Sequence, residues 1–213
     1  MGGWVLLTVS LQPHAAASPC GYSLSLSYNP CYPPKQTRTA GGEFGYKIRS
    51  FRPGDLEGVR EVFAMTRKAP GERSPAVAKM TRSILKTDLA DPVAVYGEGR
   101  FWVAERLGGG GVLGCVGLRV ATEGTRRVGE VVRLAVDEGC RGQGVGKALL
   151  LTAEEAAVKA GVQALRATTI DALETASMLY RSSGYVVVGS QAYGKEGSGG
   201  QILQYLKETE ANS

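Results

Sequence analysis

The chain has 213 residues, with 25 Lys and Arg against 20 Asp and Glu, so its formal net charge is +5 at pH 7. Hydrophobic residues make up 43% and charged residues 21%, which excludes a disordered or fibrous chain and indicates one globular domain. No apolar run reaches the roughly 18 residues of a membrane-spanning helix, and the positive excess is too spread out to predict nucleic-acid binding. The four cysteines lack CxxC spacing and the only histidine is His14, so we expect no metal site.

The first 44 residues differ from the rest of the chain. They hold five of the nine prolines and only three charged residues. Because proline interrupts helices and central strands, we predict a disordered or targeting-like tail over residues 1–44. The apolar run from Trp4 to Leu11 leaves a signal or transit peptide within residues 1–20 open as an alternative. No Lys or Arg precedes that run and the run is short, which favours a cytoplasmic protein.

From residue 45 onward the apolar pattern becomes regular. We predict a domain over residues 45–208 and a short tail over residues 209–213. Asp55 is a candidate N-cap for a first helix, and Ser74-Pro75 begins a second. The run 128–136 is almost apolar on both faces, so it predicts a central strand. The other predicted strands cover 44–51, 101–104, 112–120, 164–170, 185–188 and 201–206, and the later helices cover 144–160 and 172–181.

A glycine-rich loop follows that central strand and opens a helix. It reads Arg141-Gly-Gln-Gly-Val-Gly-Lys147, with glycine at three alternate positions. Glycine lets a ligand approach the backbone closely, and the free N–H groups at the start of a helix attract anions. Arg141 and Lys147 add positive charge at the edges of the loop. The arrangement predicts a phosphate-binding site.

The spacing within this loop separates three kinds of phosphate site. A P-loop needs GxxxxGK followed by Ser or Thr, whereas Ala148 follows Lys147 here. A dinucleotide-binding loop reads GxGxxG and follows the first strand of a parallel sheet. Here residues 142–146 read GxGxG and come late in the domain, so a nucleotide or dinucleotide binder is disfavoured. The third pattern, [RQ]-x-x-G-x-[GA], is met by residues 141–146.

Three features carry a resemblance to a known family: the glycine-rich loop, the Val-Arg-Leu-Ala-Val strand before it, and the downstream pairs Leu179-Tyr180 and Gly184-Tyr185. Through these features, residues 45–206 resemble the GNAT superfamily. These proteins are acyl-CoA-dependent N-acetyltransferases. The resemblance implies an α/β fold (an α+β mixed sheet) with six to seven strands and about four flanking helices. It also implies that the fourth and fifth strands splay apart and that the cofactor lies in the gap between them.

The resemblance further implies which residues hold acetyl-CoA, the expected co-substrate. The pantetheine arm would pair with the backbone of Leu134, Ala135 and Val136. Leu173 stands where many members carry an Asn that bonds the cofactor. The pyrophosphate would lie on the amides of the loop, beside its two cations. The loop residues in this set are Arg141, Gly142, Gln143, Gly144, Val145, Gly146 and Lys147.

Two residues are candidates for proton transfer, because the attacking amine must lose a proton and the departing thiolate gains one. Glu130 stands at the start of the central strand, where the family often has a Glu that acts as a base through water. The alternative is an ion pair with Arg126 or Arg127. Tyr180 matches the family tyrosine that often faces the sulfur of CoA and is the candidate acid, with core packing as its alternative.

Four other features have simpler interpretations. Cys140 is more often a bystander than a nucleophile in such a loop, since direct transfer needs no acyl-enzyme. Cys115 and the pair Phe101-Trp102 are expected in the core. The loop from Gly194 to Gly200 is either a mobile lid over the acceptor or a plain hairpin loop.

The sequence therefore predicts an N-acetyltransferase that transfers an acetyl group from acetyl-CoA to a primary amine by direct attack in a ternary complex. The acceptor is either a small molecule or a protein or peptide amine. The alternative is a catalytically inactive acyl-CoA-binding sensor or interaction domain, because both would keep the same phosphate loop.

Overall fold

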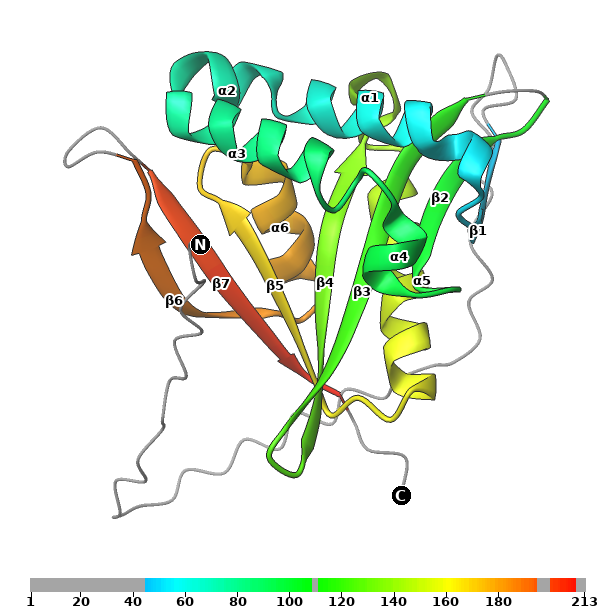
Figure 1. Ribbon diagram of the computed structural model, residues 1–213. Coiled ribbons are helices and arrows are strands. Elements are labelled where there is room, and N and C mark those ends of the chain that lie inside the picture. The colour runs from blue at the N-terminus through cyan, green and yellow to red at the C-terminus, as the bar shows by residue number, and fades with distance from the viewer. Residues whose placement is uncertain (1–44, 109–110, 195–199, 210–213) are drawn as a thin grey trace. The chain divides into compact units, whose positions relative to one another are not determined.

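A mixed seven-stranded sheet forms the centre of the described structure (Figure 1). The structure is a computed structural model that describes residues 45–108, 111–194 and 200–209. The predicted tail over residues 1–44 lies outside these ranges, as do residues 195–199 of the glycine-rich loop interpreted above as a lid or hairpin loop. Thr209, at the start of the predicted C-terminal tail, donates from its backbone to the carbonyl of Gln163 at 3.0 Å.

The strands pair in the order β1-β2-β3-β4-β5-β7-β6. Only the β4–β5 pair is parallel, and all the other neighbours are antiparallel. The strands are β1 (Tyr46–Ser50), β2 (Phe101–Arg106), β3 (Val112–Glu123), β4 (Arg126–Val136), β5 (Ala164–Ile170), β6 (Val186–Ala192) and β7 (Gln201–Glu208).

Six α-helices cover the two faces of the sheet in the described part of the chain. The first four pack on one face, and α5 and α6 pack on the other (Figure 1). They are α1 (Leu56–Thr66), α2 (Lys68–Arg73), α3 (Pro75–Lys86), α4 (Pro92–Tyr96), α5 (Val145–Lys159) and α6 (Glu174–Ser182).

We expected about four helices, and the described part of the chain has six because two short ones, α2 and α4, were missed. Helix α2 contains Pro70 and Gly71, which are poor helix formers, so its sequence carries no helical signal. Helix α4 has only five residues, too few to show a period, although Asp91 caps it by accepting from the N–H of Ala94 at 3.0 Å. Asp55 precedes α1 as expected, but its carboxylate binds Arg49 instead of capping that helix.

Strand β2 shows why both faces of the sheet are covered. Phe101 and Val103 point into the core under α1, whereas Trp102 and Ala104 point into the core under α5. All four side chains are buried, and alternation along a strand sends neighbours to opposite faces. The expectation that Phe101-Trp102 belongs to the core is confirmed, with the two rings in different cores.

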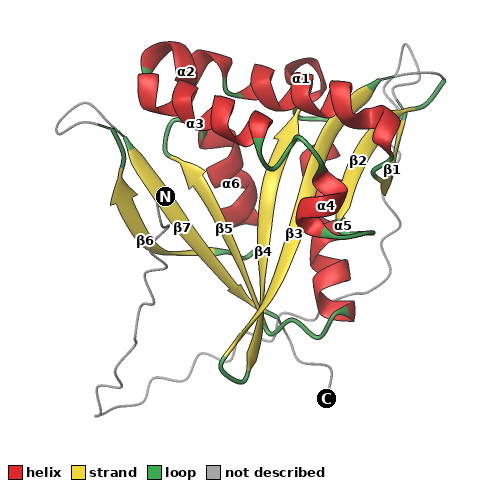
Figure 2. Ribbon diagram, viewed as in Figure 1, coloured by secondary structure: helices red, strands yellow, loops and turns green. Residues whose placement is uncertain are grey.

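Strands β4 and β5 separate towards their carboxyl ends, as Figure 2 shows. Their pairing begins at Val128 with Ala164 and ends at Val131 with Ala167. Beyond that point β4 continues to Val136 while β5 remains paired with β7 as far as Ile170. The expected splay of the fourth and fifth strands is therefore confirmed, and it opens a gap in the middle of the sheet.

No helix in the described ranges combines the length and the apolar character needed to span a membrane.

Candidate active site

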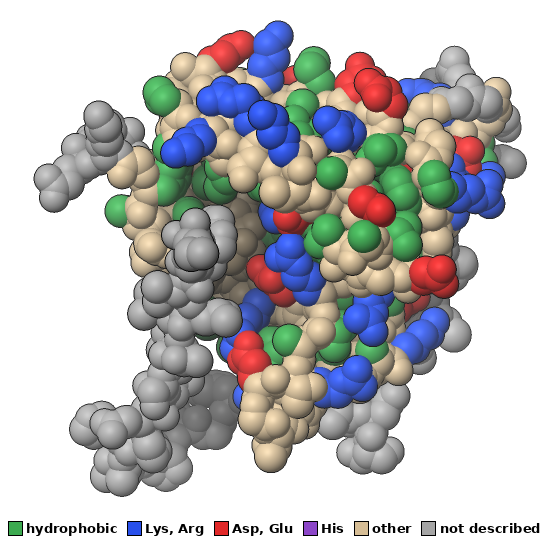
Figure 3. Space-filling model, viewed as in Figure 1, with side chains coloured by type: hydrophobic (Ala, Val, Ile, Leu, Met, Phe, Trp, Pro, Cys, Tyr) green, Lys and Arg blue, Asp and Glu red, His purple; other side chains and the backbone are tan. Residues whose placement is uncertain are grey.

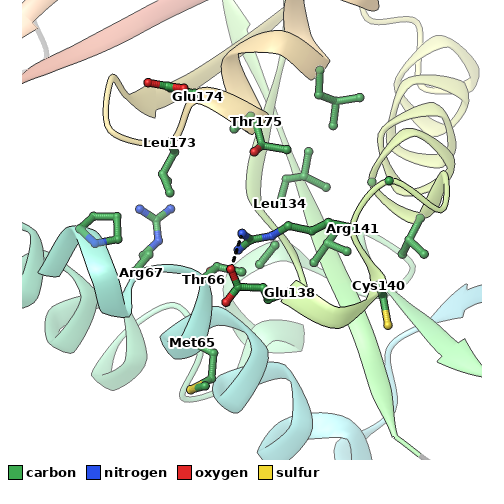
Figure 4. Close-up of a pocket in the computed structure, with 18 of the residues that line it drawn as sticks. Met65, Thr66, Arg67, Leu134, Glu138, Cys140, Arg141, Leu173, Glu174 and Thr175 are labelled. Carbon is green, nitrogen blue, oxygen red and sulfur yellow. Dashed lines mark hydrogen bonds and ion pairs between the residues drawn. The ribbon is translucent and has the colours of Figure 1, made fainter. Parts of the chain in front are cut away.

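A cavity of about 590 Å³ lies at the open end of β4. Its walls come from the junction of α1 and α2, the end of β4, the glycine-rich loop and the start of α6 (Figure 4). Gln143 is the one predicted cofactor-binding residue that does not line it, and its side-chain amide donates to the carbonyl of Gly139 at 3.2 Å. The nine that do are Leu134, Ala135, Val136, Arg141, Gly142, Gly144, Val145, Gly146 and Lys147.

The loop presents backbone N–H groups to this cavity. Gly142 and Gly144 have φ of +74° and +80°, a left-handed conformation that glycine adopts without strain. Gly144 is the N-cap of α5, and the first helical bond runs from the N–H of Ala148 to its carbonyl at 3.0 Å. The N–H groups of the preceding residues are therefore left over at the helix start, where they favour an anion.

Two cations border the loop. Arg141 reaches into the cavity, with its Nη1 atom 3.3 Å from Oε1 of Glu138 (Figure 4). Lys147, in the first turn of α5, is exposed and also lines the cavity. Figure 3 shows further Lys and Arg side chains at the surface over α2 and α3. The exposed cations of these two helices are Lys68, Arg73, Lys79, Arg82 and Lys86.

The start of α6 forms the opposite wall. Leu173 is the N-cap residue of that helix and lines the cavity with an apolar side chain (Figure 4). It cannot offer the hydrogen bond that an Asn would offer at this position. Glu174, Thr175 and Ala176 continue the same wall, so this side of the cavity combines apolar side chains with a carboxylate and a hydroxyl.

A bulge in β4 adjoins the cavity. Cys115 pairs with Ala135 and Gly117 with Val132, so two residues of β4, Arg133 and Leu134, stand opposite one residue of β3. Arg133 has φ of +56°, the only positive value among the described non-glycine residues. Because β5 has left the pairing here, the backbone of Leu134 to Val136 faces the gap.

Asp88, on the segment after α3, holds the side chain of Arg133. Its Oδ2 atom accepts from Nε of Arg133 at 3.1 Å, from Arg119 at 2.6 Å and from the hydroxyl of Tyr96 at 3.0 Å. Burial alone would raise the pKa of Asp88, but the hydrogen bonds and charge of Arg133 outweigh it and lower the pKa to about 2. Asp88 is therefore ionised at neutral pH and neutralises its cationic neighbours.

Tyr180 does not line the cavity. It lies on α6 in a cluster of aromatic rings, 5.4 Å from Tyr185 and 5.3 Å from Tyr205 between ring centroids. Burial raises its pKa, and the nearby charge of Glu130 acts in the same direction against Arg67. The hydroxyl therefore keeps its proton at neutral pH. The core-packing interpretation describes the position of the ring.

Glu130 also lies outside the lining of the cavity. Its carboxylate is 3.7 Å from Nη1 of Arg119 and its side chain is 38% exposed. Arg126, one of its expected partners, instead pairs with Glu208 at 2.6 Å. Glu130 therefore stands on β4, three residues before Arg133 at the start of the bulge, with access to solvent.

Sequence reasoning missed Arg67, the residue between α1 and α2. It lines the cavity, and its guanidinium lies 4.5 Å above the ring of Phe63. Its Nε atom is buried and has no hydrogen-bond partner among the described residues. Burial, with repulsion from Arg133, lowers the pKa of Arg67 to about 10, so it remains a cation at neutral pH. No spacing rule finds it, because its neighbours in sequence form an ordinary polar helix end.

Both described cysteines are buried. Cys115 lies in the core as expected, and burial raises its pKa to about 12. Cys140 lines the cavity, yet burial raises its pKa as well, which keeps the thiol protonated and disfavours a nucleophilic role.

Comparison with known proteins identifies the domain. Residues 97–187 match the family model described as the acetyltransferase (GNAT) domain. This chain contains a GNAT acetyltransferase domain. The match covers the splayed strands, the glycine-rich loop and the Leu-Tyr segment of α6, which carried the resemblance in the sequence. No curated protein matches the chain.

Solved structures share the fold of this GNAT domain. An acetyltransferase of the GNAT family from Staphylococcus aureus Mu50 superposes with a TM-score of 0.62 at 18% identity, over 77% of this chain and 99% of that one. A chain of the NatC complex bound to Gag peptide and CoA gives 0.58 at 14%, over 77% and 98%. NAA60 from Arabidopsis thaliana, in complex with a bisubstrate analogue, gives 0.55 at 16%, over 78% and 99%.

Proposed function

We propose that this GNAT domain transfers an acetyl group from acetyl-CoA to a primary amine by direct attack in a ternary complex. The observation that carries the proposal is the cavity at the splay of β4 and β5, which ends at the amide-lined start of α5. The N–H groups of that helix start and Arg141 would hold the pyrophosphate. The backbone of Leu134 to Val136, unpaired with β5, would hold the pantetheine arm.

The acetyl donor supplies an activated carbonyl and a thiolate leaving group. In one direct step a C–N bond forms, the C–S bond breaks, the amine loses a proton and the thiolate gains one. Within the domain, the positioning of both substrates in one cavity supplies much of the rate. The N–H groups of the β4 bulge are candidates to stabilise the oxyanion.

Tyr180 is the proposed acid and Glu130 the proposed base. Tyr180 is protonated at neutral pH, so it has a proton to give to the thiolate, and burial raises its pKa, which makes it a weaker acid than an exposed tyrosine. Glu130 is reached by solvent and stands on the strand that borders the gap, so it would take the proton of the amine through water. Since neither side chain lines the cavity, an inactive acyl-CoA-binding domain is the second candidate function.

Release of thiol from acetyl-CoA, measured with a panel of amines, separates the two candidates. The panel should contain small amines, free amino acids and short peptides, with mass spectrometry of the products. Amine-dependent thiol release and a product heavier by one acetyl group support the acetyltransferase. Tight binding of acetyl-CoA without acetylation of any amine, including a peptide panel, would support the binding domain instead.

A further inference from the structure

Arg67 is a cation in the cavity that no described carboxylate neutralises. Its guanidinium packs on the ring of Phe63 and points into the cavity from the wall opposite Arg141 (Figure 4). Burying a cation without a partner costs free energy, and a like charge on Arg133 adds to the cost. A side chain kept in this state is suited to a ligand that brings the missing negative charge.

The neighbouring groups of the domain cannot supply that charge. Tyr180 and Cys115 lie close enough to interact with Arg67, but burial raises the pKa of both groups, so both are neutral at pH 7. Asp88 already accepts from Arg119 and Arg133. The two carboxylates on the cavity wall are also not partners, because Glu138 pairs with Arg141 and Glu174 forms no ion pair among the described residues.

The charge balance around Arg67 indicates a single negative charge. Arg119 and Arg133 are matched by Glu130 and Asp88. Within this group of described arginines, Arg67 is the one without a carboxylate partner, and a ligand with one negative charge would supply it. A planar guanidinium binds a carboxylate through two parallel hydrogen bonds, and the Phe63 ring fixes its orientation beforehand.

We propose that Arg67 binds the carboxylate of the acceptor, so that the acceptor is an amino acid or a similar small amine with a free carboxylate. The inference rests on the proposed acetyl transfer. We assign the pyrophosphate to the other wall and not to Arg67, because that wall has the start of α5, Arg141 and Lys147 to bind it. The charge of Arg67 also acts on Tyr180, the proposed acid, so we assign Arg67 to the acceptor side of the proposed reaction.

Matched acceptors and matched variants test the assignment. Each free L-amino acid is compared with its carboxamide, which keeps the amine and removes the negative charge. The wild-type protein should prefer the acids. Arg67→Met should lower kcat/KM for the preferred acids by roughly 10- to 100-fold, the range for hydrogen bonds to charged groups, and change the amides little. Arg73→Met, at an exposed cavity-lining arginine of α2, should keep the preference.

Two further measurements distinguish Arg67 from a cofactor contact or a structural residue. The affinity for acetyl-CoA, measured by calorimetry, should be unchanged in Arg67→Met and reduced in Arg141→Gln. The melting temperature of Arg67→Met should equal or exceed that of wild type, since an unpaired buried charge is removed. Weaker acetyl-CoA binding or a lower melting temperature in Arg67→Met would overturn the assignment.

The proposed function and the carboxylate site fail in different ways. If wild type acetylates the amides as well as the acids, the transferase stands and the carboxylate site is wrong. If nothing is acetylated but amino acids still raise the melting temperature of the CoA-loaded wild type and not of Arg67→Met, the site stands and the transferase is wrong. If amino acids give neither acetylation nor an Arg67-dependent shift, the site is overturned.

Discussion

The two ends of the cavity carry positive charge in different ways. At the loop end, backbone N–H groups of the α5 start face the opening beside the exposed Arg141 and Lys147. At the other end, Arg67 lines the cavity and packs on the ring of Phe63, and no described carboxylate pairs with it. Nearby, outside the lining, Arg133 is held by Asp88 from the segment after α3. Binding of an anion at the loop end therefore depends on backbone conformation, whereas binding and reaction at the Arg67 end depend on single side chains.

This comparison predicts a separation of effects. Changes in the loop should alter the affinity for acetyl-CoA, and changes near Arg67 should alter turnover at constant affinity.

The largest effect is expected from Gly144→Glu. A carboxylate at the start of α5 would occupy and repel the site of the pyrophosphate, so acetyl-CoA affinity should fall by about 100-fold or more. Calorimetry and the rise in melting temperature with acetyl-CoA measure the loss. Gly144→Asn is the matched control, because Asn tolerates a left-handed backbone and brings no charge. Wild-type affinity in Gly144→Glu would mean that the loop does not hold the cofactor.

Tyr180→Phe tests the other end. The substitution keeps the ring in its aromatic cluster and removes only the hydroxyl. If Tyr180 gives its proton to the thiolate, kcat should fall by roughly 10- to 1,000-fold while acetyl-CoA affinity stays constant. Tyr205→Phe, at a neighbouring buried ring, is the control for packing. Equal turnover in wild type and Tyr180→Phe would remove the tyrosine from the mechanism.

Glu130→Gln should have a smaller effect that depends on pH. Without the base, the rate at neutral pH should fall by roughly 10- to 100-fold. The loss should shrink at high pH, where more of the acceptor is already a free amine. The pH–rate profiles of wild type and variant measure this convergence, and a loss that is constant across pH would assign Glu130 to positioning of Arg119 instead.

Asp88→Asn should act on stability. It leaves Arg133 partly buried without its carboxylate, so the free energy of unfolding should fall by about 2–3 kcal/mol. The pKa of Asp88 is lower in the folded protein than in the unfolded chain, so its contribution is present above roughly pH 4 and is lost as pH falls through about 2. Urea unfolding of wild type and variant at several pH values should converge towards low pH, and parallel curves would contradict the ion pair.

The smallest effect is expected from removal of residues 1–43. That segment lacks the apolar period of a packed element, and we propose that residues 45–208 fold as the domain. Melting temperature and acetyl-CoA affinity of the truncated chain should match those of the full chain. Loss of a cooperative transition would show that the domain extends further towards the N-terminus.

The sequence predicted the loop end well and the Arg67 end poorly. Strand β4, the glycine-rich loop and α5 are contiguous, so their order and spacing could be read directly. Arg67, Asp88 and Arg133 come from three separate segments, and each looks in sequence like an ordinary polar residue. Only the packing of α1 and α3 on the sheet brings them together. The end of β6 was also predicted too early. A strand ending at 188 was expected, but β6 continues to Ala192, through residues 189–191, which have no apolar side chains.

The short pairing of β4 with β5 also has a mechanical consequence. The seven strands behave as two half-sheets, one of four strands and one of three, joined along Val128–Val131 and Ala164–Ala167. These four residue pairs form a hinge, and the part of β4 beyond them is the arm that would move. From Val131 to Val136 the arm is about 17 Å long at about 3.3 Å per residue. A 10° rotation of one half-sheet against the other would therefore change the width of the gap at Val136 by roughly 3 Å.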